Sequence, residues 1–124
     1  MSSKMNAAGI VLTQGDTLNI PLCFARRQNG KKIPVNLDNS VIRMQVRKDA
    51  ESLPVITKEV ANHYDADNGK TILQLTPDDT NVPVGIYYTD IEIQFVDGQK
   101  FTFYPADPNR KAYFKVVEQF TKGD

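Results

Sequence analysis

The sequence predicts an all-β protein, and three observations carry that prediction. Apolar and polar residues alternate in many short segments, which is the pattern of strands with one buried face. Clusters of Gly, Pro, Asn and Asp separate these segments at intervals of roughly 8–14 residues. No stretch has apolar residues at the spacing of an amphipathic helix. Seven to eight such strands predict an antiparallel sandwich or barrel.

The first half of the chain contains two clear strands and a hairpin turn. Residues 18–24 alternate, and Pro21 within them predicts an edge strand or a bend, because proline cannot donate to a ladder. Asn29-Gly30 suits the positive φ angles of a tight hairpin. Residues 41–47 alternate with two arginines on one side, so one face of that strand is expected to be solvated.

The second half continues the pattern through the longest alternating run and the Asp97-Gly98 hairpin turn. Further strands are expected at residues 53–60, 71–75, 87–95, 101–103 and 112–116. One phase of these strands faces the interior. The expected core is Leu22, Ile42, Met44, Leu73, Ile91, Ile93, Phe95, Phe103, Phe114 and Val116.

The length of 124 residues suits one domain. Its ordered core is expected at about residues 9–119. The ends, residues 1–8 and 120–124, are polar, small and without a pattern, so they are expected to be loose.

Composition excludes several classes of protein. Fifteen basic residues balance fifteen acidic ones, so no basic excess supports a nucleic-acid partner. No apolar run is long enough to span a membrane, and a single cysteine excludes an intrachain disulfide. Charge is uneven, however: residues 1–62 carry nine basic and five acidic side chains, and residues 63–124 carry six and ten. This asymmetry reflects either solvated faces or complementary patches that meet when copies associate.

No residue pattern predicts an enzyme, a cofactor or a metal site. His63 is the only histidine, and Cys23 is its only possible thiol partner, with no Cys-x-x-Cys motif or helix N-terminus to activate it. The segment that begins at Asp65 lacks the glycine and glutamate of a calcium loop and is expected to be a turn. Asp90 and Glu92 share one strand face, which a solvated outer surface explains better than glycoside chemistry.

Three tyrosines are the candidate contact residues. Tyr88, Tyr104 and Tyr113 lie on the outward phase of their strands. They are expected to form a subunit contact or a stacking platform for a ligand, although singly exposed tyrosines are also ordinary.

A turn motif gives the first resemblance. Gly85 and Tyr87 follow residues 76–80, and this order is similar to the tyrosine corner of immunoglobulin-like domains. The resemblance implies an immunoglobulin-like antiparallel β-sandwich and a hydrogen bond from the Tyr87 hydroxyl to backbone within residues 77–84. Here residues 81–84 are additional, and the cysteines and tryptophan of antibody domains are absent.

The wider order of strands and turns resembles the amino-terminal β-sandwich of phage baseplate upper proteins and related prophage tail proteins. The stretches that carry this resemblance are residues 14–20, 30–37, 41–46, 69–75, 85–93 and 97–103. It covers about residues 10–118, and its motifs are patterns of strands and turns.

This resemblance implies a structural or assembly protein of a phage or prophage tail or baseplate. Such a protein is made in the host bacterial cytoplasm, is located in the virion and contacts other tail proteins or itself. From the balanced charge and the lack of a long apolar run, no nucleic-acid or membrane partner is expected. The alternative is a carbohydrate- or cell-surface-binding module, and a small enzyme is the third reading.

Overall fold

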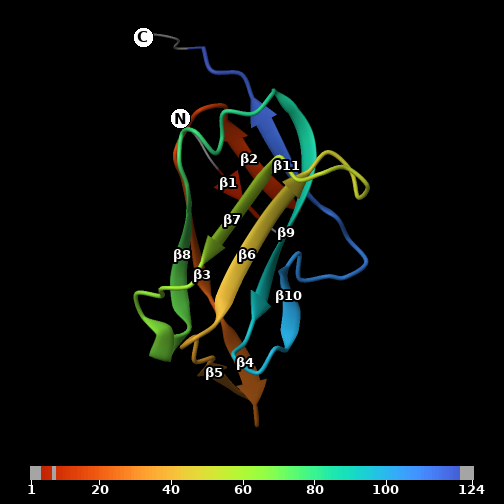
Figure 1. The fold of residues 1–124 in the computed structure, drawn as a ribbon. Helices are drawn as coiled ribbons and strands as arrows, with labels where there is room; N and C mark the ends of the chain where they lie inside the picture. The colour runs from red at the N-terminus through yellow and green to blue at the C-terminus, as the bar shows by residue number, and fades with distance from the viewer. Residues whose placement is uncertain (1–3, 7, 121–124) are drawn as a thin grey trace.

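In the computed structural model, residues 4–6 and 8–120 are described, and they form strands with one short 3₁₀ helix, η1 (Ala66–Asn68). Figure 1 shows them arranged as two facing layers. The strands are β1 (Lys4–Met5), β2 (Gly9–Thr13), β3 (Leu18–Cys23), β4 (Ala25–Gln28), β5 (Lys31–Pro34), β6 (Val41–Arg47), β7 (Ile56–Val60), β8 (Lys70–Leu75), β9 (Gly85–Gln94), β10 (Lys100–Tyr104) and β11 (Ala112–Val117).

The larger sheet has the order β1-β2-β11-β9-β6-β7, with β10 also paired to β9. The smaller sheet consists of β3 and β8, and β4 and β5 form a separate hairpin. All pairs are antiparallel except β2 and β11, which run parallel. The chain is therefore an all-β, immunoglobulin-like antiparallel sandwich, as the sequence predicts.

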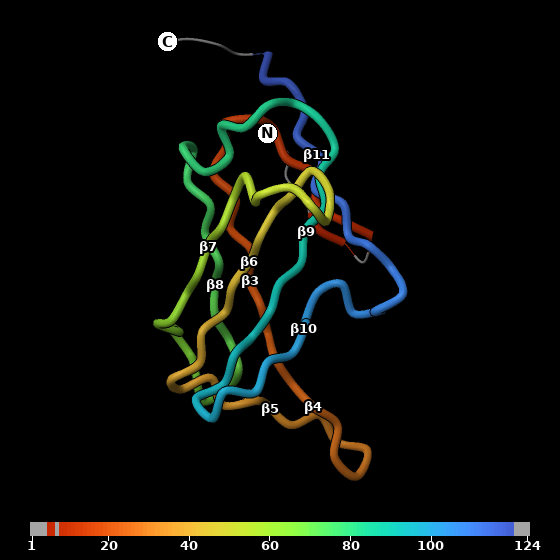
Figure 2. The backbone as a smooth tube through the Cα atoms, turned by 45° about the vertical axis from the view of Figure 1, so that its right-hand side comes forward, coloured from red at the N-terminus to blue at the C-terminus, as the bar shows by residue number. Residues whose placement is uncertain are grey.

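Strand β9 is the centre of the larger sheet. One of its edges pairs with β6 over Tyr88–Gln94. Its other edge pairs first with β11 and then with β10. Figure 2 shows the segment between β10 and β11 leaving this edge and returning to it. The fold thus places residues 105–111 beside the middle of β9.

The buried side chains form one cluster between the two sheets. Eight of the ten residues expected in the core are buried, and Phe95 and Phe103 are partly buried against the cluster. The cluster also includes Ile10 and Leu12, which the strand pattern did not single out. They belong to β2, a strand held beside β11 in parallel register.

Two local expectations agree with the structure. Asn29 and Gly30 have φ angles of 53° and 77° and close the β4–β5 hairpin. Pro21 lies in β3, which pairs only with β8 among the strands that the structure describes. Pro21 therefore lies in an edge strand, as the missing N–H requires.

The amino-terminal end, which was expected to be loose, makes backbone pairings where the structure describes it. Lys4–Met5 pair with β2, and the Oδ1 atom of Asn6 accepts hydrogen bonds from the N–H groups of Ala8 and Gly9. A short polar segment is ordered here because tertiary pairing supplies what its sequence pattern lacks. Residues 1–3, 7 and 121–124, also expected to be loose, lie outside the described residues.

Two further expectations need adjustment. The strand expected at residues 53–60 begins only at Ile56, and the Leu53 side chain is 85% exposed. The oppositely charged halves of the sequence do not form two ends of the molecule. Strands β2, β3 and β6 of the first half pair with β11, β8 and β9 of the second, so the two charge sets interleave.

Candidate functional site

Tyr87 makes the corner contact that the motif implied. Its ring is 4% exposed, and its hydroxyl donates a 2.7 Å hydrogen bond to the carbonyl of Pro83, within residues 77–84. The Nζ atom of Lys48 lies 5.0 Å from the ring centroid. Gly85, the other corner residue, begins β9. The corner fixes how the chain enters β9, which is a structural role.

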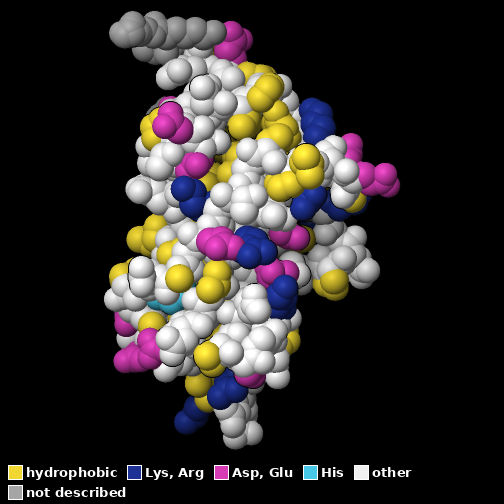
Figure 3. All heavy atoms as spheres, viewed as in Figure 1, with side chains coloured by type: hydrophobic (Ala, Val, Ile, Leu, Met, Phe, Trp, Pro, Cys, Tyr) yellow, Lys and Arg dark blue, Asp and Glu magenta, His cyan; other side chains and the backbone are white. Residues whose placement is uncertain are grey.

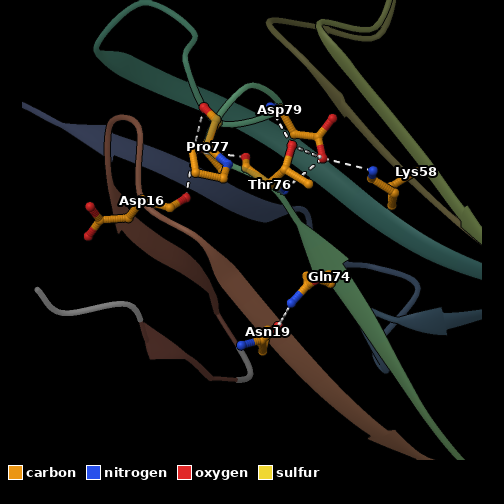
Figure 4. A network of polar contacts seen from close by, with 8 residues as sticks. Asp16, Asn19, Lys58, Gln74, Thr76, Pro77 and Asp79 are labelled. Carbon is orange, nitrogen blue, oxygen red and sulfur yellow. Dashed lines mark hydrogen bonds and ion pairs between the residues drawn. The ribbon is translucent and has the colours of Figure 1, made fainter. Parts of the chain in front are cut away.

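Polar contacts tie the turn after β8 to both neighbouring layers (Figure 4). The carboxylate of Asp79 accepts from the N–H of Thr76 and pairs with Lys58 of β7 at 2.8 Å. The buried hydroxyl of Thr80 donates to the carbonyl of Asp16 at 2.6 Å. Partial burial alone would raise the pKa of Asp79. Hydrogen bonds from Lys58 and Thr76, with the charge of Lys58, outweigh it, and the pKa is lowered.

Tyr104 is not on the surface, contrary to the sequence prediction. It is 6% exposed, and its hydroxyl donates a 2.6 Å hydrogen bond to the carbonyl of Asn6. The cause is a β-bulge: Thr102 pairs with Glu92 and Tyr104 with Ile91, so two steps on β10 match one on β9. The extra residue turns Tyr104 inward. Burial raises the pKa of Tyr104, and nearby Tyr113 adds to the rise.

Tyr88 and Tyr113 do come together. They are direct partners across β9 and β11, on the outer face of the larger sheet. Tyr113 is half-buried, and its ring lies against Gly9, where an added Cβ would come within 2.5 Å of ring atom Cδ1. Tyr88 is 41% exposed, with the Nζ atom of Lys111 5.5 Å from its ring centroid. Of the three candidate tyrosines, Tyr88 is the one that remains open to a partner.

The outer face of the larger sheet changes character along β9. Ile86 lies beside Lys115 near one end, and toward the other end Asp90 and Glu92 lie opposite Gln45 and Arg43. Figure 3 shows mixed basic and acidic side chains across the middle of this face. Arg43 is paired there with Glu59 of β7. The shared face of Asp90 and Glu92, expected from the alternation, is part of this polar region.

A groove of about 550 Å³ lies next to this polar region. Outward side chains of β6 and β9 line one side, and the β10–β11 segment lines the other. Its lining includes Gln45, Arg47, Tyr88, Asp90, Thr102 and Lys111. The groove was not predicted from the sequence, because its two walls are far apart in the chain and the connecting segment has no strand pattern.

His63 and Cys23 do not form a reactive pair in any contact of the described structure. His63 is hydrogen-bonded through both ring nitrogens, to Thr71 Oγ1 at 2.9 Å and to the carbonyl of Ser40 at 2.9 Å. Because a carbonyl only accepts, Nε2 carries the proton that bonds Ser40. His63 therefore links the segment before β6 to β8. Cys23 is exposed on β3.

The segment that begins at Asp65 is a tight turn around η1, and the Asp65 carboxylate accepts from the side-chain amide of Asn68. Among residues 4–6 and 8–120, no group of three or more His, Cys, Asp or Glu side chains is placed to hold a metal ion. The same part of the chain contains no helix with the length and apolarity to span a membrane.

Comparisons with known proteins add little. No protein family matches the chain, and no curated protein sequence is similar to it. Among solved structures, the chain is similar to that of murine CRIg, with 13% sequence identity and a TM-score of 0.36. The similarity covers 95% of this chain and 97% of that one. At this level it carries no argument about function.

Proposed function

We propose that this chain is a structural or assembly protein of a phage or prophage tail or baseplate, which acts through protein–protein contacts. The observation that carries the proposal is the open edge of β3. The smaller sheet has only two strands, and no further strand of the described chain pairs with β3. An open edge accepts an additional strand from another chain, or from a second copy, by backbone hydrogen bonds.

The direction of the backbone groups along β3 follows from one hydrogen bond. The N–H of Phe24 donates to the carbonyl of Gly69, directly opposite, at 2.8 Å. Hydrogen-bonded and non-bonded pairs alternate in an antiparallel ladder. The even-numbered residues of β3 therefore direct their backbone groups toward β8, and Asn19, Pro21 and Cys23 direct theirs outward.

This edge is selective in what it accepts. It offers the N–H groups of Asn19 and Cys23 and the carbonyls of Asn19, Pro21 and Cys23. All three residues are exposed, and β3 has no strand partner other than β8 within the described chain. Pro21 removes the central donor, which disfavours indiscriminate pairing with any strand and favours a partner in one register.

The tail or baseplate setting rests on the resemblance of strand and turn order to baseplate upper proteins. The fold is compatible with that resemblance. The subunit contact that was expected through Tyr104 is not part of the proposal, because that side chain is buried. Tyr88 on the opposite sheet stays available for a second contact.

The experiment that tests this setting is a search for the chain in purified particles. Prophage induction in the encoding strain, density-gradient purification and quantitative mass spectrometry measure its copy number per particle. We expect copies in a fixed ratio to known tail proteins, retained after washing in high salt. Abundant chain in the cell lysate with none in the particle fraction would overturn the proposal.

A further inference from the structure

The groove on the larger sheet has the size and position of a ligand site. Its volume of about 550 Å³ falls within the usual range of small-molecule sites, about 300–1,000 Å³. It lies on the face opposite the smaller sheet, so it is separate from the β3 edge. Its floor is rigid sheet, and residues 105–111 form its wall.

Two exposed residues of the groove, Tyr88 and Asp90, offer polar groups to a ligand. Within the described chain the carboxylate of Asp90 makes no hydrogen bond, although the charge of Arg47 acts on it, and the hydroxyl of Tyr88 makes no hydrogen bond. Arg47 is held in place, because Nη1 donates to the carbonyl of Ser52 and Nη2 donates to Oε1 of Gln45 at 3.0 Å. With Oε1 occupied, the amide N–H groups of Gln45 remain to donate to a ligand.

The charges of the groove nearly cancel. The lining holds three basic side chains, Arg47, Arg110 and Lys111, and two acidic ones, Asp49 and Asp90. The Nε atom of Arg110 also lies 4.0 Å from the carboxylate of Asp107, which is outside the lining. An anionic ligand would meet Asp90, with Glu92 next to it on the same face. A cationic ligand would meet the basic side chains. A neutral ligand that both donates and accepts hydrogen bonds can bond to the acidic and the basic side chains alike, without repulsion between like charges.

Asp90 is exposed, so water solvates its carboxylate, and ligand hydroxyl groups would replace that water. Partial burial raises the pKa of Asp90, the charge of Glu92 raises it further, and Arg47 partly opposes both. Hydroxyl groups that donate to this carboxylate would stabilise its charged form. Tyr88 adds an aromatic face, which packs well against the C–H face of a sugar ring.

We propose that the groove binds a neutral carbohydrate chain. Asp90 accepts from adjacent sugar hydroxyls, Gln45 donates to a ring or hydroxyl oxygen, and Tyr88 stacks against a pyranose ring. This activity is additional to the proposed assembly role.

The test is a screen of neutral oligosaccharides on a glycan array (glucans, galactans, mannans, rhamnans and N-acetylglucosamine oligomers), followed by calorimetric titration of the best binder. Asp90→Asn keeps the shape and removes the charged acceptor, and Tyr88→Ala removes the ring. Each is expected to weaken binding about tenfold or more. The matched controls Asp67→Asn and Tyr64→Ala are outside the groove lining and should bind as the unchanged protein does.

Thermal unfolding of each variant shows that it is folded. The proposal is overturned if no neutral oligosaccharide binds, if both groove variants bind normally, or if acidic glycans or peptides bind in preference. Light scattering separates this result from the assembly proposal, because Asp90→Asn lies away from the β3 edge and should self-associate as the unchanged protein does.

Discussion

The two sheets of the sandwich offer different chemistry to the outside. Both edges of β9, the longest strand of the larger sheet, are paired, so its backbone groups are used within the sheet. The outer face of β9 presents side chains, among them Tyr88 and Asp90. Within residues 4–6 and 8–120, the smaller sheet has two strands and presents unpaired backbone groups along β3. Side chains distinguish ligands by shape and charge, whereas a strand edge recognises backbone. The molecule therefore has one surface suited to a ligand and one suited to another chain.

The largest expected effect on stability concerns the hydrophobic core that packs between the two sheets. Ile93 is 3% exposed in the core, and Ile72 is 43% exposed on the smaller sheet. Ile93→Ala should lower the free energy of unfolding by about 2–5 kcal/mol, because it leaves a cavity between the layers. Ile72→Ala should cost less than about 1 kcal/mol. Urea denaturation measures both, and equal losses would contradict the assigned phase of the strands.

The next largest loss of stability is expected from removing the hydroxyl groups of two buried tyrosines. Tyr87→Phe and Tyr104→Phe each remove one hydrogen bond to a carbonyl and should each cost about 1 kcal/mol. Tyr64, which is 66% exposed, provides the control, and Tyr64→Phe should leave stability unchanged. A loss at Tyr87 without one at Tyr104 would mean that the contact with Asn6 does not hold the amino-terminal strand.

These two tyrosines also show how far the sequence predicts this structure. Tyr87 was predicted because its contact is local and belongs to a motif. Tyr104 was misplaced because strict alternation extends through β10, and a bulge breaks it one residue earlier. The partner of Tyr104 is Asn6, 98 positions away. No local pattern carries that information.

The same distinction applies to the candidate sites. Pro21 predicted either an edge strand or a bend, and the structure shows the edge strand, since a missing N–H is a property of one residue. The sequence also placed Tyr88 outward and Asp90 beside Glu92. It did not predict the groove, because residues 105–111 line it only after β10 and β11 have both paired with β9.

Two carboxylates, Asp79 and Asp90, should contribute to the stability of the protein with opposite dependence on pH. The pKa of Asp79, in the turn after β8, is lowered from 3.8 in the folded state, so its contribution is present above that pH and lost as pH falls through the folded pKa. The pKa of Asp90, on β9, is raised, so its contribution is present at low pH and lost as pH rises through the folded pKa.

Neutral variants measure this difference. At pH 7, Asp79→Asn should destabilise by less than about 1 kcal/mol, because the pair with Lys58 is partly exposed. Asp90→Asn should leave stability unchanged or raise it. Thermal unfolding of both variants from pH 3 to 7 gives the comparison, and the same sign for both would contradict the assigned environments.

One substitution pair tests whether the β3 edge makes the protein–protein contact. Cys23→Pro removes an outward N–H and no bond to β8, while Cys23→Ala removes the thiol alone. Multi-angle light scattering across a concentration series, with far-ultraviolet circular dichroism as the check on folding, measures association. We expect the unchanged protein and Cys23→Ala to associate alike and Cys23→Pro to be folded and monomeric. Association of Cys23→Pro equal to that of Cys23→Ala would contradict this expectation, as would an unchanged protein that stays monomeric and retains no particle protein when immobilised.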